Sequence, residues 1–210
     1  MSKRIVYILI IVLLVLLGLV RFDRYLAQKS KTKMDVPVHA EIGDLLFRSF
    51  SYTVASSSLY RYSGMPGHVA IIITEGEFLP DEASYSAIKV IEARYYDRSK
   101  KKKKNNRVGI NPADINFGEK YKGQRFLLKT HLNDKEKAKL VAYSNSQIGK
   151  PYNLFADKHD TMEYNCATFV RHVLDFTAKI DVDGDGGSMF FPNDIFDYPL
   201  YLETNNRIHF

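Results

Sequence analysis

The hydrophobic positions of this chain fall into one long apolar run, followed by shorter segments with strand or helix periodicity. Residues 5–20 carry no charge, and Arg21 ends the run. Beyond it, several short segments are rich in β-branched and apolar residues, which predicts strands. These segments are residues 41–48, 68–74, 87–95, 107–112 and 125–129. In residues 87–95 one strand face is expected to carry Ile88, Val90 and Glu92, and the other Lys89, Ile91 and Ala93.

Two helices follow the strand-rich part of the chain. The first is predicted over residues 134–148, with Asn133 as its N-cap and the Gly149-Lys-Pro151 stretch as its stop signal. The second is predicted over residues 165–177, where Cys166 lies one turn before Phe169 and Val170 on the apolar stripe. This order of elements predicts an α+β fold in which an antiparallel sheet or small barrel packs against helices.

The strands at residues 68–74 and 87–95 are expected to form an antiparallel hairpin with its tip near Pro80. With that tip, the numbers of paired residues sum to about 160, which sets Glu92 opposite His68. Directly opposed residues share a sheet face with Cβ atoms about 4.5–5.5 Å apart, close enough for a carboxylate to meet an imidazole. A slip of one residue would place the two side chains on opposite faces.

The N-terminal run is predicted to be a hydrophobic helix that is either a signal peptide or a single-span membrane anchor. Its sixteen residues, Ile5 to Val20, rise about 24 Å, slightly less than a hydrocarbon core. We favour an uncleaved anchor, because no A-x-A type cleavage site follows the run. The resulting organisation is an anchor or signal segment at 1–22, a tether at 23–38 and a folded domain at 39–210. The short basic head before the run favours an extracytoplasmic domain, at the cell surface or in the periplasm.

Composition and charge exclude some classes of protein and leave others open. The chain has 210 residues, 45% of them hydrophobic, enough for a full core. Lysine and arginine outnumber aspartate and glutamate by 30 to 24, and five of the lysines form the run at 100–104. Such a run is typical of a solvated loop, with contact to an anionic surface as the alternative. The basic residues fall on no nucleic-acid motif, so nucleic acid is not an expected partner. Oligomeric state does not follow from these numbers.

Cys166 is the single cysteine of the chain, which excludes an intramolecular disulfide and the paired-cysteine zinc motifs. From its position it is either a small buried hydrophobe or a nucleophile. A nucleophilic thiol needs a lowered pKa, an imidazole base and a group that orients that imidazole. A helix N-terminus, His68 and Glu92 could supply these three needs. His159, seven residues before the cysteine, is the main rival for the role of base.

These residues occur in an order that resembles a known family, the permuted papain-like amidases of the YaeF/YiiX type, which are related to the NlpC cell-wall peptidases. The resemblance covers about residues 40–175 and implies a circularly permuted papain-like fold. The segments that carry it are Gly43-Asp44, Gly67-His68, Val90-Ile-Glu92-Ala93, Gly149-Lys-Pro-Tyr152-Asn153 and Tyr164-Asn-Cys166.

The resemblance implies Cys166 as nucleophile, His68 as base and Glu92 as the third member of the site. It further implies substrate contacts from Tyr152, Tyr164 and Asn165. The expected activity is that of a membrane-tethered cysteine hydrolase, which cleaves an amide or acyl bond of a cell-wall peptide or lipid-like substrate through a thioester and needs no cofactor. The alternative is a catalytically inactive domain of the same fold that binds peptide or lipid in its cleft.

An acidic segment near the C-terminus partly matches a calcium-binding loop. Asp181, Asp183 and Asp185 alternate with other residues, and Gly186 stands at the sixth position. The twelfth position is Pro192, where a bidentate glutamate belongs in such a loop. A plain acidic turn is therefore favoured over a calcium site, and no other metal site is expected.

Overall fold

A six-stranded antiparallel sheet is the centre of the fold. The computed structural model describes residues 6, 7, 10–12, 37–49, 66–79, 83–94, 106–118, 125–183, 186, 187, 190–196 and 207–209. The strand order in the large sheet is β6-β5-β3-β2-β7-β8, and β1 pairs with β4 in a separate two-stranded sheet. The described elements confirm the predicted α+β class.

The elements follow one another along the chain with short strands first and the longer helices later. The strands are β1 (Val38–Ala40), β2 (Leu45–Ser49), β3 (Pro66–Ile72), β4 (Gly76–Phe78), β5 (Lys89–Ala93), β6 (Val108–Pro112), β7 (Arg125–Leu128) and β8 (Arg207–His209). The helices are η2 (Ala83–Ser86, a 3-10 helix), α3 (Asp114–Phe117), α4 (Asp134–Ser146), α5 (Cys166–Ala178) and α6 (Pro192–Phe196).

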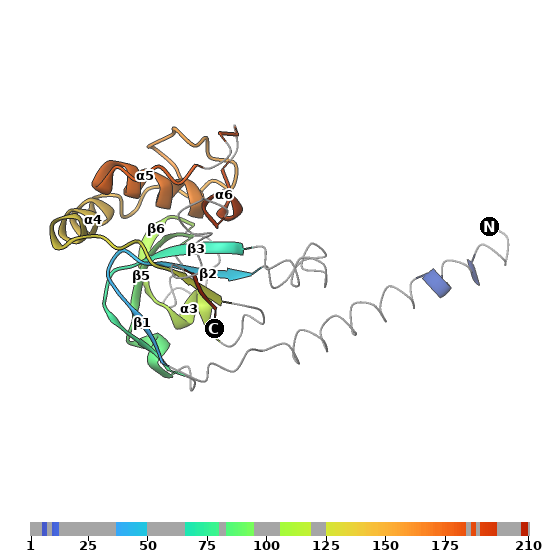
Figure 1. The fold of residues 1–210 in the computed structure, drawn as a ribbon. Helices are drawn as coiled ribbons and strands as arrows, with labels where there is room; N and C mark the ends of the chain where they lie inside the picture. Colours follow the sequence, from blue (N-terminus) through green and yellow to red (C-terminus); the bar gives the residue numbers. More distant parts are fainter. Residues whose placement is uncertain are drawn as a thin grey trace.

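Both faces of the large sheet are covered, and each carries its own hydrophobic core. Helices α4, α5 and α6 lie on one side of the sheet, and β1 and α3 lie on the other (Figure 1). Alternate residues of each strand divide between the two sides: Val69 and Ile71 pack toward α5, whereas Ala70 and Ile72 pack with Phe117 of α3. This double burial explains why the central strands are apolar on both faces.

The register between β3 and β5 differs from the prediction by two residues. The pairs are Ile71↔Ile91 and Ile72↔Val90, so the paired numbers sum to 162 rather than 160. The predicted antiparallel pairing of the two strands is confirmed, but their connection is not a plain loop, because β4 and η2 lie between them and β4 pairs with β1. A shift of two residues preserves the face of every side chain, so His68 and Glu92 stay on one side as diagonal neighbours.

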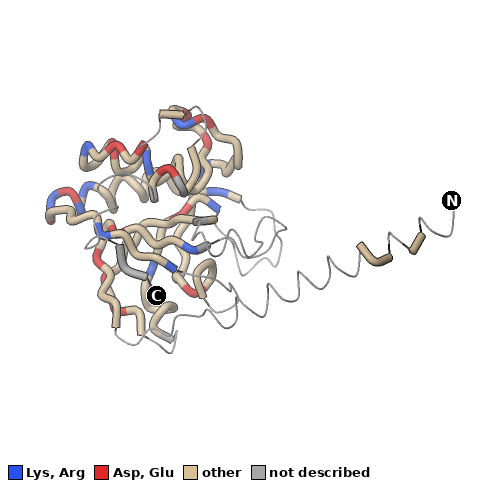
Figure 2. The backbone as a smooth tube through the Cα atoms, turned by 45° about the vertical axis from the view of Figure 1, so that its right-hand side comes forward, with Lys and Arg blue, Asp and Glu red and all other residues tan. Residues whose placement is uncertain are grey.

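The predicted N-terminal anchor and the lysine run fall largely or wholly outside the described residues. Of residues 5–20, five are described, and all five are helical. In the part of the chain that the structure describes, we find no helix with the length and apolarity that a membrane span requires. Lysines 100–104 lie outside the described ranges. Basic and acidic residues are interspersed along the described backbone, including helices α4 and α5 (Figure 2).

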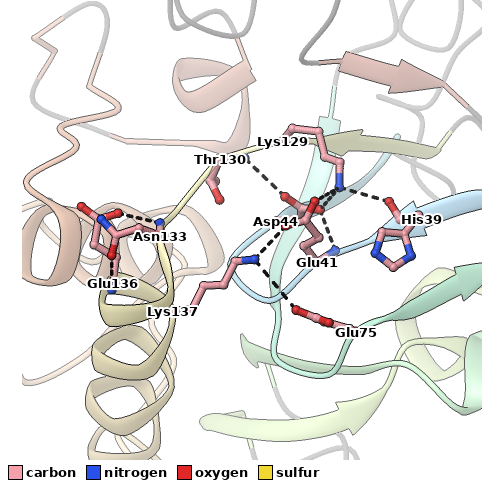
Figure 3. Close-up of polar contacts among 9 residues, drawn as sticks. All are labelled: His39, Glu41, Asp44, Glu75, Lys129, Thr130, Asn133, Glu136 and Lys137. Atoms are coloured by element: carbon pink, nitrogen blue, oxygen red, sulfur yellow. Dashed lines mark hydrogen bonds and ion pairs between the residues drawn. The ribbon is translucent and has the colours of Figure 1, made fainter.

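A buried carboxylate ties the start of β2 to the end of β7. The turn before β2 places Gly43 at φ 95°, and a side chain there would meet Leu132. Asp44, only 2% exposed, accepts hydrogen bonds from the backbone N–H of Glu41 at 2.8 Å and of Thr130 at 3.3 Å. The ammonium of Lys129 lies 2.7 Å from the same carboxylate, and Lys137 of α4 bonds Glu41 beside it (Figure 3).

We expect Asp44→Ala to lower the free energy of unfolding by about 3 kcal/mol, because it leaves buried N–H donors and an ammonium without their acceptor. Chemical denaturation of the two proteins measures this loss. Glu75→Gln is the matched control, since that carboxylate is half exposed and lies 3.9 Å from Lys137. It is expected to change the free energy by less than about 0.5 kcal/mol. Equal effects of the two substitutions would contradict the account of Asp44.

Candidate active site

The N-terminus of α5 fixes the position of Cys166. Asn165 is the N-cap, and its Oδ1 accepts hydrogen bonds from the backbone N–H groups of Ala167 and Thr168, both at 2.8 Å. The hydroxyl of Thr168 accepts in turn from the N–H of Asn165, which completes a capping box. The Asn165 amide also donates to the carbonyl of Phe190 at 3.0 Å. The first residue of the helix is therefore held on both sides by a buried polar network.

His68 and Glu92 meet inside the fold as the sequence predicts. Nε2 of His68 lies 2.5 Å from Oε2 of Glu92, and neither side chain is exposed. Since a carboxylate oxygen accepts, Nε2 carries the proton of this hydrogen bond. The ring of His68 also stacks on Phe117, with the ring centroids 5.5 Å apart. The imidazole is thus fixed in position by one charged partner and one aromatic wall.

Two asparagines occupy the other oxygen of Glu92. Asn111 of β6 donates to Oε1 at 2.7 Å, and Asn116 of α3 donates to the same atom at 2.6 Å. With His68 on Oε2, the buried carboxylate receives three hydrogen bonds. A buried charge is costly unless it is satisfied in this way. These amides stabilise the carboxylate and restrict its rotation, so they position His68 indirectly.

The sheet opens between β3 and β5 where the thiol approaches the imidazole. His68 lies on the face of Ala70 and Ile72, while Cys166 belongs to the core on the opposite face. Pairing between β3 and β5 ends at Ile71↔Ile91, so the first residues of β3 pair with β2 alone. The backbone N–H of Val69 therefore has no partner strand on that side, and it donates to the sulfur of Cys166.

Cys166 and His68 change each other's protonation. Burial by itself raises the pKa of the thiol, but the hydrogen bond and charge of His68, the Val69 N–H and the charge of Arg48 together bring this pKa below its ordinary value. Burial likewise lowers the pKa of the imidazole, yet hydrogen bonds to Cys166 and Glu92 and the charges of both hold it above its ordinary value. Both shifts favour a thiolate beside an imidazolium.

The geometry leaves one ring nitrogen for the sulfur. Nε2 of His68 is engaged by Glu92, and no described residue, Cys166 included, lies in hydrogen-bond geometry with the buried Nδ1. The Cys166 thiol, which acts on this imidazole, is the group left for Nδ1. Cys166 is buried, with 7% of the residue exposed. The three residues expected to act as nucleophile, base and orienting carboxylate are thereby brought together.

Of the three residues expected to contact substrate, Tyr152 is the best placed. It is half-buried, and burial together with the nearby charge of Cys166 raises the pKa of its phenol to about 12, against the charge of Arg94. The expectation for Tyr164 was wrong, because its side chain is completely buried and its hydroxyl donates to Gln147 at 3.1 Å. Asn165 is 2% exposed, and its amide is used by the helix cap. It positions Cys166.

Two other histidines near Cys166 in the sequence, His159 and His172, point away from the contact between Cys166 and His68. His172 projects from the far side of α5, where its Nε2 lies 2.5 Å from the hydroxyl of Tyr143. His159 is exposed on the loop before α5 and follows Asp157, whose carboxylate accepts from its backbone N–H. The imidazole whose hydrogen bond and charge lower the pKa of Cys166 is that of His68, so the structure favours His68 as base over both.

The acidic segment at 181–186 is arranged around cations of the protein itself. The ammonium of Lys158 lies 2.7 Å from Asp183, and Arg171 bonds Asp181 at 3.2 Å. Asp185 lies outside the described residues. In the described part of the chain, no group of three or more His, Cys, Asp or Glu residues could hold a metal ion. The calcium alternative therefore has no support from Asp181 and Asp183, whose carboxylates stabilise the loop by ion pairs instead.

Sequence reasoning missed four residues of this site: Arg48, Arg94, Asn111 and Asn116. Asn111 and Asn116 interrupt apolar segments, at Ile110-Asn111-Pro112 and Ile115-Asn116-Phe117, and both are buried. A lone amide in such a position signals a buried polar partner. No comparable sequence signal marks Arg48 or Arg94, because an arginine at a strand end is ordinary.

Comparison with known proteins supports the fold. No protein-family model matches the chain, and no curated protein matches it. Among solved structures, it is similar to the metalloprotein YiiX from Escherichia coli O157:H7, with a TM-score of 0.51 and 16% sequence identity. The match covers 81% of this chain and 96% of that one. The chain therefore has a YiiX-like fold.

We predict that Cys166 is alkylated by iodoacetamide with a rate–pH midpoint below the value of about 8.5 for a free thiol. His68→Ala removes the hydrogen bond and the positive charge that lower this pKa, so the midpoint moves to higher pH. At pH 6 the rate of the variant should be about one tenth of the wild-type rate or lower. Mass spectrometry of the intact protein follows the reaction. The same rate–pH profile in both proteins would contradict the proposed pairing.

The two helix caps provide a matched pair of variants. Asn165→Ala and Asn133→Ala each remove an N-cap with a capping box, so each should lower the free energy of unfolding by about 1–2 kcal/mol. Only Asn165 positions Cys166, and we therefore expect Asn165→Ala alone to slow alkylation of the thiol. Denaturation and iodoacetamide rates measure the two effects. Slower alkylation in both variants would indicate a general loss of stability.

Proposed function

We propose that this protein is a cysteine hydrolase that cleaves an amide or acyl bond through Cys166, His68 and Glu92. The supporting observation is the buried chain of contacts from the thiol to the imidazole and from the imidazole to a carboxylate held by two amides. The YiiX-like fold and the order of histidine strand before cysteine helix support a permuted papain-like amidase. The function rests on the site, because a shared fold does not determine activity.

The proposed reaction has two acyl-transfer steps. The Cys166 thiolate attacks the substrate carbonyl, a carbon–sulfur bond forms, and the carbon–nitrogen or carbon–oxygen bond breaks as the His68 imidazolium gives its proton to the leaving group. A water molecule then attacks the thioester and gives a proton to His68. The carbon–sulfur bond breaks, the acid is released, and the Cys166 thiolate is restored beside the His68 imidazolium. Glu92 keeps the imidazole oriented throughout and stabilises its charged form.

The oxyanion of the tetrahedral intermediate is expected to bind the backbone N–H of Cys166. The next two N–H groups of the helix, those of Ala167 and Thr168, already donate to Asn165. No described residue accepts a hydrogen bond from the Cys166 N–H. The phenol of Tyr152, neutral at physiological pH because its pKa is about 12, is a second donor near the sulfur.

The cellular setting is part of the proposal. Residues 5–20 would tether the domain to a membrane, with the folded part outside the cytoplasm. The substrate would be a cell-wall peptide amide or a lipid-like acyl compound, and neither needs a cofactor for this chemistry. A domain of the same fold that binds such a ligand without cleaving it is the alternative. This alternative requires that the Cys166 thiol is only packed in the core and does not react.

Screening the wild-type protein against electrophilic amide and acyl probes tests the function. We expect a probe to label Cys166 covalently and a matched substrate to be hydrolysed. Cys166→Ala should abolish labelling, and hydrolysis should fall by about a thousandfold or more, because the nucleophile is lost. The control is His131→Ala, an exposed histidine outside the site. A slow thiol in the wild type, with equal turnover by wild type and Cys166→Ala, would favour the binding domain.

A further inference from the structure

Arg94 is an exposed arginine held in a conformation that non-glycine residues rarely adopt. Its φ is 101°, directly after the strand that carries Glu92. An extended residue 94 would continue the alternation of β5 and point to the same side as Val90 and Glu92, into the packed interior. The positive φ directs the chain away from this alternation, and the side chain is exposed. The strain therefore keeps a guanidinium at the surface.

Backbone contacts place Arg94 on the same edge of the fold as the nucleophile. The N–H of Arg94 donates to the carbonyl of Arg107 at 3.1 Å, and Arg107 pairs with Pro151 in a β-bridge. Tyr152 follows and forms the next bridge with Tyr164, two residues before Cys166. Four segments therefore lie side by side, from Arg94 to the start of α5. The charges of Arg94 and Cys166 both act on the phenol of Tyr152, which lies between these segments.

The charge of Arg94 has no partner in the described part of the protein. No carboxylate among the described residues forms an ion pair with it, whereas Arg171, Lys129, Lys137 and Lys158 all have one. Two carboxylates of these segments already accept hydrogen bonds: Glu92 bonds His68, and Glu163 accepts from Asn153. Arg48 adds a second positive charge that acts on Cys166. Among the described residues, Arg94 is therefore a positive charge at this edge without an ion-pair partner.

We propose that Arg94 binds a carboxylate of the substrate beside the bond that Cys166 attacks. A guanidinium fork matches a carboxylate with two parallel hydrogen bonds, and one unpaired arginine balances one negative charge. The assignment rests on the proposed function, since it names a feature of the substrate of that reaction. It favours an acidic peptide amide over a neutral lipid ester. Arg94 is a specificity-determining residue, distinct from the residues that carry the acyl transfer.

Two small alkylating reagents test this assignment without knowledge of the substrate. Iodoacetate carries a carboxylate and iodoacetamide does not, yet both react with the same thiolate. The ratio of their rates therefore cancels any change in the pKa of Cys166. We expect Arg94→Gln to lower the iodoacetate-to-iodoacetamide ratio roughly two- to fivefold at low ionic strength. Added salt should bring the wild-type ratio toward that of the variant.

Two control variants complete the experiment. Arg94→Lys keeps the charge and should retain most of the wild-type ratio. Lys135→Gln removes one exposed charge from α4 and should leave the ratio unchanged. An equal ratio in wild type and Arg94→Gln, or an equal fall in Lys135→Gln, would overturn the assignment. Failure of the proposed function looks different: iodoacetamide itself would then react slowly with the wild type, and His68→Ala would not slow it further.

Discussion

The buried contact between His68 and Glu92 is the interaction on which the rest of the site depends. It places a charged pair where neither side chain is exposed, and such a pair is stable only if the remaining polar atoms are satisfied. Asn111 and Asn116 meet that requirement from two other elements, β6 and α3. The carboxylate therefore links three parts of the fold to one imidazole nitrogen. The other nitrogen is left for the thiol.

A second constraint brings that thiol within reach from the opposite face of the sheet. If β3 and β5 paired along their whole length, backbone hydrogen bonds would close the gap between Cys166 and His68. Pairing ends at Ile71↔Ile91, and the Val69 N–H donates to sulfur where a strand would otherwise accept. The cap at Asn165 holds the start of α5 against this gap. The incomplete pairing of β3 with β5 and the capped start of α5 thus together bring the Cys166 thiol close to His68.

The sequence predicts those features that depend on local chemistry or on the alternation of side chains between the two faces of a strand. Asn133 was predicted as an N-cap because capping is local, and that cap is present. The helix expected from residue 165 begins one residue later, at Cys166, with Asn165 as its N-cap. His68 and Glu92 share a face despite the wrong register, because a shift of two residues preserves parity. Tyr164 was misjudged because burial depends on tertiary packing. The contacts of Asn111, Asn116 and Arg94 follow from how distant strands meet, and a single sequence does not encode that meeting in any local pattern.

The central claim is that Cys166 and His68 form a thiolate–imidazolium pair. Nuclear magnetic resonance of the protein labelled with nitrogen-15 in histidine, titrated with pH, reports the protonation of both nitrogens of His68 directly. The account predicts that in the wild type the ring stays protonated on both nitrogens to higher pH than in Cys166→Ser, where the negative charge is lost. An imidazole that loses its proton at the same pH in both proteins would contradict the account.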